Sequence, residues 1–187
     1  MYGMINKALR HMVCRQHGEA VWRRILENAK VNDDQFLLGE FYADKITYDL
    51  VGATATALRI PVAEVLEAFG EYWVLETAQE GYGALMDAGG ENLEEFLTNL
   101  PSFHDRITLI FPNLQPPSFR CERLSDSSMR IHYFTQRPGL APFVKGLLQG
   151  LGKRYRTAMV VDQVGSREAG SDHDIFNVRW VAAGQTV

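Results

Sequence analysis

The spacing of apolar residues changes once along the chain, at a proline-rich segment, and this change limits the possible folds more than any other feature. Before Phe111, apolar residues recur every three or four positions, which is typical of helices. The segment 112–119, PNLQPPSF, holds three prolines, which remove hydrogen-bond donors and end helices. From Ser118 onward, apolar and polar residues alternate as they do in strands. The sequence therefore predicts helices first and a sheet second, an α+β fold.

Helices are expected over most of the first part of the chain. The expected ranges are 4–13 (before Gly18), 19–29, 44–58, 61–74 and 92–110. Asp44 is expected to cap the third helix, and Pro61 suits the first position of the fourth. Turns or interruptions are expected at Asn32, Asp33 and Asp34 and at Gly81, Gly83, Gly89 and Gly90.

Four strands and one helix are expected after the prolines. The strands begin at Ser118 and continue over 129–136, 157–164 and 175–182, and a helix over 139–155 separates the second strand from the third. This order predicts a four-stranded, mainly antiparallel sheet.

Composition excludes several classes of protein. The chain has 187 residues and 21.1 kDa, the size of one domain. Its 19 basic and 23 acidic residues give a net charge of −4, which argues against nonspecific nucleic-acid binding. No apolar run approaches the ~18 residues of a membrane span, and the N-terminus MYGMINKALRHM lacks the unbroken apolar stretch of a signal peptide. Cys14 and Cys121 are too few for a disulfide framework or a four-cysteine zinc site, and both are expected to be buried. A cytoplasmic protein without membrane or nucleic-acid partners is predicted.

His104 is the first candidate functional residue. It lies within an apolar helical stripe made of Leu93, Phe96, Leu97, Leu100, Ile107 and Phe111. An imidazole there is either a core histidine bonded to a backbone carbonyl or an axial ligand of a metal in an apolar cavity. One histidine without nearby cysteine or carboxylate ligands suits haem better than zinc, because a porphyrin already supplies four nitrogens. The other histidines are expected to be solvated (His11, His17 and His173) or exposed on the strand face opposite Tyr133 (His132).

Tyr133, Thr135 and Arg137, in the run YFTQR, are the second candidate group. Residues spaced by two on a strand lie on one face, so these would present two hydroxyls and a guanidinium together. Such a group holds carboxylates, and a haem carries two propionates. The alternative is a polar sheet face in water.

Together these motifs resemble the haem nitric-oxide/oxygen-binding (H-NOX) domains, including the haem domain of the soluble guanylate cyclase β subunit. The resemblance rests on SFHDRITLI, PPSFRC and YFTQR, with MYGMINKAL, KITYDLVGATA, FGEYW and EGYG, and cyanobacterial stand-alone members look most similar. It implies a single domain over 1–187, with a distal helical subdomain about 1–60, a proximal subdomain about 61–187, and haem b between them.

The resemblance also implies roles for individual residues. His104 would be the proximal iron ligand, Tyr133, Thr135 and Arg137 would hold the propionates, and Pro117 would press on the porphyrin. The family motif is Tyr-x-Ser-x-Arg, so Thr135 departs from it but keeps the hydroxyl.

The distal side is expected to be apolar. Haem proteins that retain dioxygen stabilise the negative charge on its outer atom with a hydrogen-bond donor, whereas nitric oxide and carbon monoxide need none. Oxygen-binding relatives carry a tyrosine where this chain has Phe143. By the same analogy, Trp73 lies on the distal side, where it either offers its indole N–H or only fills volume, and Ile5 and Phe69 complete an apolar wall.

The resemblance thus implies a sensor of nitric oxide that also binds carbon monoxide, excludes oxygen and is not an enzyme. Its output partner would be a histidine kinase, a cyclic-dinucleotide enzyme or a guanylate cyclase. An oxygen-binding haem protein, a haem enzyme and a haem-free interaction module remain the alternatives.

Overall fold

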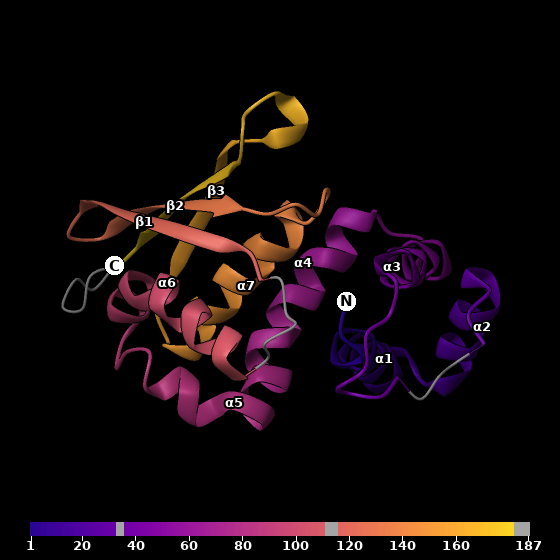
Figure 1. Cartoon of the computed structure of the whole chain (residues 1–187). Helices are drawn as coiled ribbons and strands as arrows, with labels where there is room; N and C mark the ends of the chain where they lie inside the picture. The colour runs from indigo at the N-terminus through magenta and orange to yellow at the C-terminus, as the bar shows by residue number, and fades with distance from the viewer. Residues whose placement is uncertain (33–35, 111–115, 182–187) are drawn as a thin grey trace. The chain divides into compact units, whose positions relative to one another are not determined.

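The computed structural model of the chain describes residues 1–32, 36–110 and 116–181. Within them the chain forms two compact units, Met1–Phe69 and Gly70–Val187. The elements are coloured along the chain in Figure 1. Among the described residues, no helix combines the length and the apolar character needed to cross a membrane.

The first unit is helical. It contains α1 (Gly3–His17), α2 (Glu19–Ala29), α3 (Asp44–Leu58) and most of α4 (Val62–Tyr72). The first three helices contact one another around an apolar core that includes Leu9, Trp22, Ile25 and Leu50. The predicted ranges of these helices are confirmed, but Asp44 is the first residue of α3 and not its cap. Its carboxylate instead pairs with the N-terminal amine at 2.5 Å, and the expected turn at Asp33 and Asp34 lies outside the described residues.

The second unit continues from α4 with a run of three helical segments. A π-helical turn, Trp73–Thr77 (η1 in the element order), leads into α5 (Ala78–Asp87), and α6 (Leu93–Ile110) follows. The interruption expected at Gly81 and Gly83 is present as a kink within α5, because Tyr82 between them departs from helical geometry (φ −140°, ψ 21°).

The sheet consists of β1 (Ser118–Ser125), β2 (Ser128–Phe134), β3 (Met159–Gly165) and β4 (Asp174–Trp180). Helix α7 (Ala141–Arg154) separates β2 from β3, and a 3₁₀ turn, η2 (Arg167–Ala169), precedes β4. The strand order is β1-β2-β4-β3 and every pairing is antiparallel, which confirms the predicted α+β class. The predicted strands are present, although β2 ends two residues earlier than expected.

One face of the sheet is covered by α6 and α7 (Figure 1). Alternate residues of β2 (Met129, Ile131, Tyr133) point to this face and are at most 3% exposed. They pack with Leu97 and Leu100 of α6 and with Val144, Leu148 and Leu151 of α7. The core therefore holds α6, which carries His104, against the strand that carries Tyr133.

Helix α7 also approaches the segment at the start of the second unit very closely. A Cβ at Gly70 would overlap the carbonyl oxygen of Phe143 and lie 2.7 Å from the amide nitrogen of Leu147. On the facing helix, a Cβ at Gly150 would lie 2.9 Å from the Cβ of Val74. Glycine at both positions lets the two backbones meet, and thereby fixes the place of Phe143.

We expect Gly70→Ala to lower the free energy of unfolding by about 3 kcal/mol, because the added methyl group meets backbone that has no room to move. Gly52→Ala is the matched control, since nothing lies within 4 Å of a Cβ at Gly52 in α3. That change should be neutral or stabilising by up to about 1 kcal/mol. Urea unfolding measures both, and equal midpoints for Gly70→Ala and the unchanged protein would contradict the close approach.

Candidate functional site

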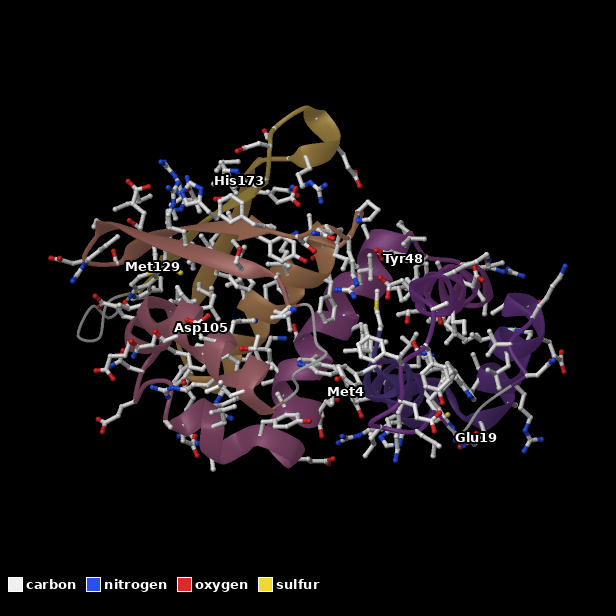
Figure 2. The ribbon with its side chains drawn as sticks, in the orientation of Figure 1. Met4, Glu19, Tyr48, Asp105, Met129 and His173 are labelled. Atoms are coloured by element: carbon white, nitrogen blue, oxygen red, sulfur yellow. The ribbon has the colours of Figure 1, made fainter. Side chains whose placement is uncertain are left out.

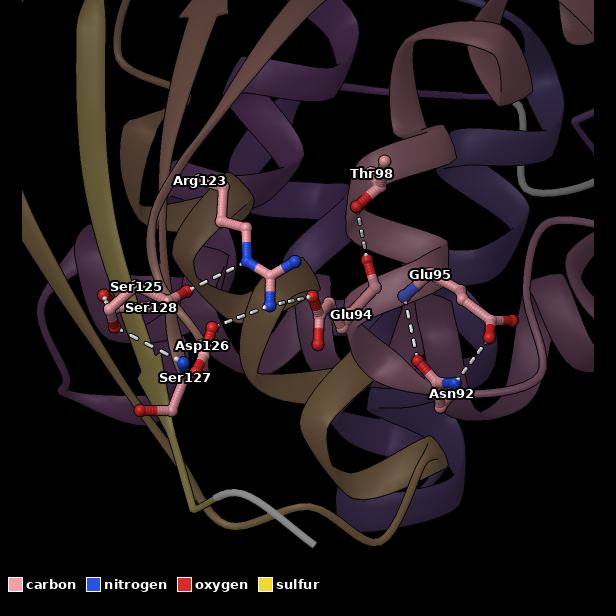
Figure 3. A network of polar contacts seen from close by, with 9 residues as sticks. All are labelled: Asn92, Glu94, Glu95, Thr98, Arg123, Ser125, Asp126, Ser127 and Ser128. Atoms are coloured by element: carbon pink, nitrogen blue, oxygen red, sulfur yellow. Dashed lines mark hydrogen bonds and ion pairs between the residues drawn. The ribbon is translucent and has the colours of Figure 1, made fainter.

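Helix α6 begins at a side-chain cap, shown in Figure 3. The carboxamide oxygen of Asn92 accepts a hydrogen bond from the Glu95 amide at 2.9 Å, and the Glu95 carboxylate reaches back to the Asn92 side chain at 2.8 Å. The same carboxylate accepts the Glu91 amide at 2.9 Å. This reciprocal pattern is a variant of the capping box, in which the Glu95 carboxylate accepts the amide of Glu91 in place of that of Asn92.

The start of α6 is also tied to the sheet. Arg123 of β1 pairs with Glu94 at 3.0 Å and with Asp126 of the β1–β2 turn at 3.2 Å, and it donates to the Ser125 carbonyl at 3.3 Å (Figure 3). Surface ion pairs of this kind add little stability, but this one fixes the first turn of α6 to a particular hairpin.

Pro101 lies inside α6, three residues before His104. Proline has no amide hydrogen, so the carbonyl of Leu97 receives no helical hydrogen bond from position 101. The apolar stripe is fully buried before this point, where Leu93, Phe96, Leu97 and Leu100 are each at most 5% exposed, and it is half-buried after it, at Ile107. Phe111, the last residue of the predicted stripe, lies outside the described residues. The half-buried His104 therefore lies on a helix whose first half is fixed and whose hydrogen bonding is weakened next to it.

The imidazole of His104 makes one hydrogen bond within the described part of the chain. Its Nδ1 lies 3.0 Å from the carbonyl oxygen of Leu100, so Nδ1 carries the proton and donates it. The lone pair of the neutral ring is then on Nε2. Burial lowers the pKa of His104, against smaller opposing effects of the Leu100 hydrogen bond and the Asp105 charge. The ring is therefore held neutral, in the tautomer that a metal ligand needs.

Aromatic side chains connect His104 to the second candidate group. The ring of Phe119 on β1 lies 4.7 Å from the imidazole centroid and 5.4 Å from that of Tyr133. Phe119 and Tyr133 are paired across β1 and β2. The ring centroid of Phe103 lies 5.6 Å from that of the imidazole. Sequence analysis did not single out Phe119, although it lies in the quoted run PPSFRC.

The prediction that Tyr133, Thr135 and Arg137 lie on one face of one strand is wrong, because β2 ends at Phe134. Tyr133 is 3% exposed on the face covered by the helices. Beyond the strand, the hydroxyl oxygen of Thr135 accepts the backbone amide of Arg137 at 3.1 Å and bends the chain. Thr135 and Arg137 are half-buried in this bend. The alternation rule fails here because the threonine hydroxyl offers the backbone a local hydrogen bond in place of the strand ladder.

Arg167 of η2 supports this bend, although the sequence pattern did not identify it as a functional residue. Its guanidinium donates to the carbonyl oxygen of Thr135 at 2.7 Å, and its backbone amide donates to Asp174 at 3.1 Å. No motif marks Arg167, because its role depends on a contact between segments 32 residues apart.

The remaining predicted residues are distributed over both units. Pro117 is half-buried directly before β1, and Phe143 is half-buried on α7. Trp73 begins the π-helical turn and packs against the core of the second unit. Ile5 lies on α1 in the first unit and is half-buried. Phe69, 2% exposed, is the last residue of that unit.

The predictions for the other polar candidates are partly wrong. His11 and His17 are exposed as expected, but His132 and His173 are 6% and 9% exposed and contact each other. His132 does lie on the face opposite Tyr133, and it is covered by the segment that precedes β4, which the sequence pattern did not reveal. Both cysteines are partly buried, and burial raises the pKa of Cys121 to about 12.

The donor set fits a haem. Within the described ranges, no three His, Cys, Asp or Glu side chains are arranged to hold a metal ion, so a site built from several protein ligands is not found there. A porphyrin needs only one protein ligand, and the Nε2 of His104 suits that position. The hydroxyls of Tyr133 and Thr135 and the guanidinium of Arg137 are donors suited to carboxylates.

Comparison with known proteins decides the family. The model of a family described as haem-NO-binding (HNOB) matches residues 2–163. The chain belongs to this haem-NO-binding, or H-NOX, family. It is thus a haem-binding gas-sensor domain of the type found in soluble guanylate cyclases. The cyanobacterial stand-alone type stays a prediction.

Solved H-NOX structures share the fold. The H-NOX protein from S. oneidensis in the Fe(II)NO ligation state superposes with a TM-score of 0.88 at 21% identity, covering 97% of this chain and 99% of that one. The H-NOX protein from Shewanella woodyi gives a TM-score of 0.81 at 23% identity and covers 100% of this chain and 97% of that one.

Curated relatives are longer proteins. Soluble guanylate cyclase gcy-34 from Caenorhabditis elegans is 35% identical over 156 residues, which are 82% of this chain and 23% of the relative. The rat guanylate cyclase soluble subunit beta-2 is 34% identical over 91 residues, 49% of this chain and 13% of that subunit. The H-NOX chain spans about a quarter of the length of gcy-34 and of similar nematode relatives.

Proposed function

We propose that this H-NOX domain senses nitric oxide through a ferrous haem b bound by the Nε2 of His104. The hydrogen bond from Nδ1 to the Leu100 carbonyl carries this proposal, because it leaves Nε2 as the nitrogen with a lone pair. The neutral state of the ring and its apolar neighbours, Phe103 and Phe119, support the same role.

We propose that Tyr133, Thr135 and Arg137 hold the two haem propionates. Phe119 links Tyr133 to the imidazole of His104, and all three residues lie where β2 ends and the chain bends. Arg167 positions the backbone of this bend without being part of the donor set. Pro117, between the proline-rich segment and β1, is proposed to press on the porphyrin.

The preference for nitric oxide over oxygen rests on Phe143. Dioxygen needs a hydrogen-bond donor at its outer atom, and a phenyl ring supplies none. Ile5, Phe69 and Trp73 are proposed to complete the distal wall. Carbon monoxide, which also needs no donor, is proposed as a second ligand.

The signal is proposed to leave through α6. A haem held by the Nε2 of His104 would supply the site at which the gas binds, and loss of the bond to His104 on gas binding would be the signal. His104 would then be released, while the first turn of α6 stays fixed by Asn92, Glu95 and the Arg123–Glu94 pair. The helix has a break in its hydrogen bonding at Pro101, so its second half can move relative to its first.

We propose that this movement reaches an effector, in the same chain or a separate one. A guanylate cyclase is the effector most consistent with the relatives, and a histidine kinase or a cyclic-dinucleotide enzyme is the alternative. The domain itself is proposed to have no catalytic activity.

His104→Gly should lower haem content by at least about tenfold, because removing even an outer-shell partner of a metal ligand costs about 10- to 100-fold. Added imidazole should restore the haem and its five-coordinate ferrous spectrum. Absorption spectroscopy measures both effects, with His17→Gly at the exposed end of α1 as the control. An unchanged spectrum in His104→Gly would refute the ligand assignment.

Arg137→Ala should speed the transfer of haem to apo-myoglobin by about 10- to 100-fold, the loss expected for a charge-assisted hydrogen bond. Arg179→Ala is the control, because Arg179 pairs with Asp162 at 2.7 Å in an exposed position on β4. If the two variants retain haem equally well, Arg137 does not hold a propionate.

Phe143→Tyr should raise oxygen affinity by about tenfold, because the phenol adds one hydrogen bond to a partly charged ligand. Phe143→Leu adds no donor and should leave oxygen affinity low. Spectra of the ferrous protein in air and under argon make the comparison, and a tyrosine variant that stays as oxygen-free as the leucine variant would refute the role of Phe143.

A further inference from the structure

Two buried histidines lie on the face of the sheet turned away from α6 and α7. Nδ1 of His132 on β2 lies 2.7 Å from Nε2 of His173, which directly precedes β4. Nδ1 of His173 lies 2.5 Å from the carboxylate of Asp172. Figure 2 shows His173 across the sheet from Asp105 of α6. The two imidazoles therefore form a hydrogen-bonded pair that the haem site does not use.

The hydrogen bonds fix where protons are in the neutral pair. A carboxylate only accepts, so Nδ1 of His173 donates to Asp172 and its Nε2 is an acceptor. Nδ1 of His132 must then carry a proton and donate it to His173. The lone pair that remains is on Nε2 of His132. A second added proton would put hydrogens on both facing nitrogens, 2.7 Å apart, so this geometry accepts only one.

Charged groups surround the Nε2 of His132 on the neighbouring strands. From β1, the Glu122 carboxylate lies 3.7 Å away and the Arg120 guanidinium 3.5 Å away. Arg130 of β2 pairs with Glu122 at 3.7 Å. Burial, followed by the Arg120 and His173 charges, lowers the pKa of His132, and Glu122 opposes this shift.

The pair is joined to the end of β2. The ring of Phe134 stacks on His173 with centroids 4.2 Å apart and planes at 26°. Phe134 lies between Tyr133 and Thr135 in the chain, so this stacking places His173 against the last residue of β2, directly before the bend at Thr135. Asp174, the next residue after His173, also accepts the amide of Arg167, whose guanidinium holds the Thr135 carbonyl.

We propose that His132 and His173 share a single proton-binding site, and that its protonation loosens the end of β2 and weakens binding of the group held by Tyr133 and Thr135. The second half rests on the proposed function, in which that group is a haem propionate. The added proton puts positive charge on a buried ring next to Arg120. When the His132–His173 hydrogen bond breaks, the charged ring is no longer held in this buried position. The ring of Phe134 then loses the support of its stacking partner, His173.

The direction with pH follows from the lowered pKa of His132. In the closed form, His132 and His173 are hydrogen-bonded to each other and both neutral. This form is fully favoured over the opened form above the ordinary histidine pKa of about 6.5. As the pH falls below that value, the opened form takes up a proton more readily than the closed form, so the closed pair becomes less stable. By reciprocity, binding at Tyr133 and Thr135 lowers the proton affinity of the pair.

Nuclear magnetic resonance titration of the imidazole Cε1–H signals tests the shared site on the full chain, with and without haem. We expect the pair to take up one proton, with the His132 midpoint below about 6.5. His173→Gln and Arg120→Gln should each raise that midpoint, and the exposed His11 and His17 serve as references in the same sample. Uptake of two independent protons, with a His132 midpoint unmoved by His173→Gln, would overturn the shared site.

Haem transfer to apo-myoglobin between about pH 5.5 and 7.5 tests the coupling. When the pH is lowered, the rate of haem transfer should rise about threefold more in the unchanged protein than in His132→Gln. This factor corresponds to a change of about half a unit in the pKa of the histidine pair when haem binds. His17→Gln should behave as the unchanged protein does, and any acid lability of the His104 bond is common to all three. Equal rises in all three would overturn the coupling.

The two experiments separate the two proposals. A chain that binds no haem at any pH would refute the proposed function and the coupling together, while the titration still decides whether the proton is shared. A chain that binds haem with a flat pH difference would refute the coupling alone.

Discussion

The hydrogen bond from Nδ1 of His104 to the Leu100 carbonyl decides which nitrogen of the ring is able to bind a metal. It depends on α6 having a buried apolar face, which holds Leu100 at 5% exposure against the sheet. It also depends on the α-helical spacing, which places the ring over the carbonyl four residues earlier. The bond is compatible with a packed core histidine as well. The family match shows that the domain binds haem, and we propose His104 as its ligand.

The rest of the second unit orients this helix with respect to the end of β2. Arg123 fixes the first turn of α6 to one end of the β1–β2 hairpin, and Phe119 links His104 to Tyr133 toward the other. Gly70 and Gly150 bring the backbone of α7 against the segment that begins the unit, and so place Phe143. Each contact is between segments that are distant in sequence, so the site exists only once the sheet has formed.

Much of this could be predicted from the sequence, because periodicity reports which face of an element is buried. The stripe through Leu97 and Leu100 predicts α6, and the alternation at Met129 and Ile131 predicts β2. Local hydrogen bonds override periodicity where β2 ends, since Thr135 binds the Arg137 amide. Arg167 and the His132–His173 pair could not be predicted, because each depends on which loop covers which strand. The His104 motif was informative because its helical spacing and the chemistry of its imidazole both indicate a ligand that faces an apolar cavity.

Burial of Cys121 has a consequence for how the domain would report its signal. A thiol whose pKa is about 12 is ionised to roughly one part in 10⁵ at neutral pH, and thiolate is the reactive form. Oxidised nitrogen species that form from nitric oxide would therefore react slowly with Cys121, because so little of its thiolate is present. In the proposed role, Cys121 would therefore keep no covalent record of past exposure, and the response at this strand would follow the gas concentration of the moment.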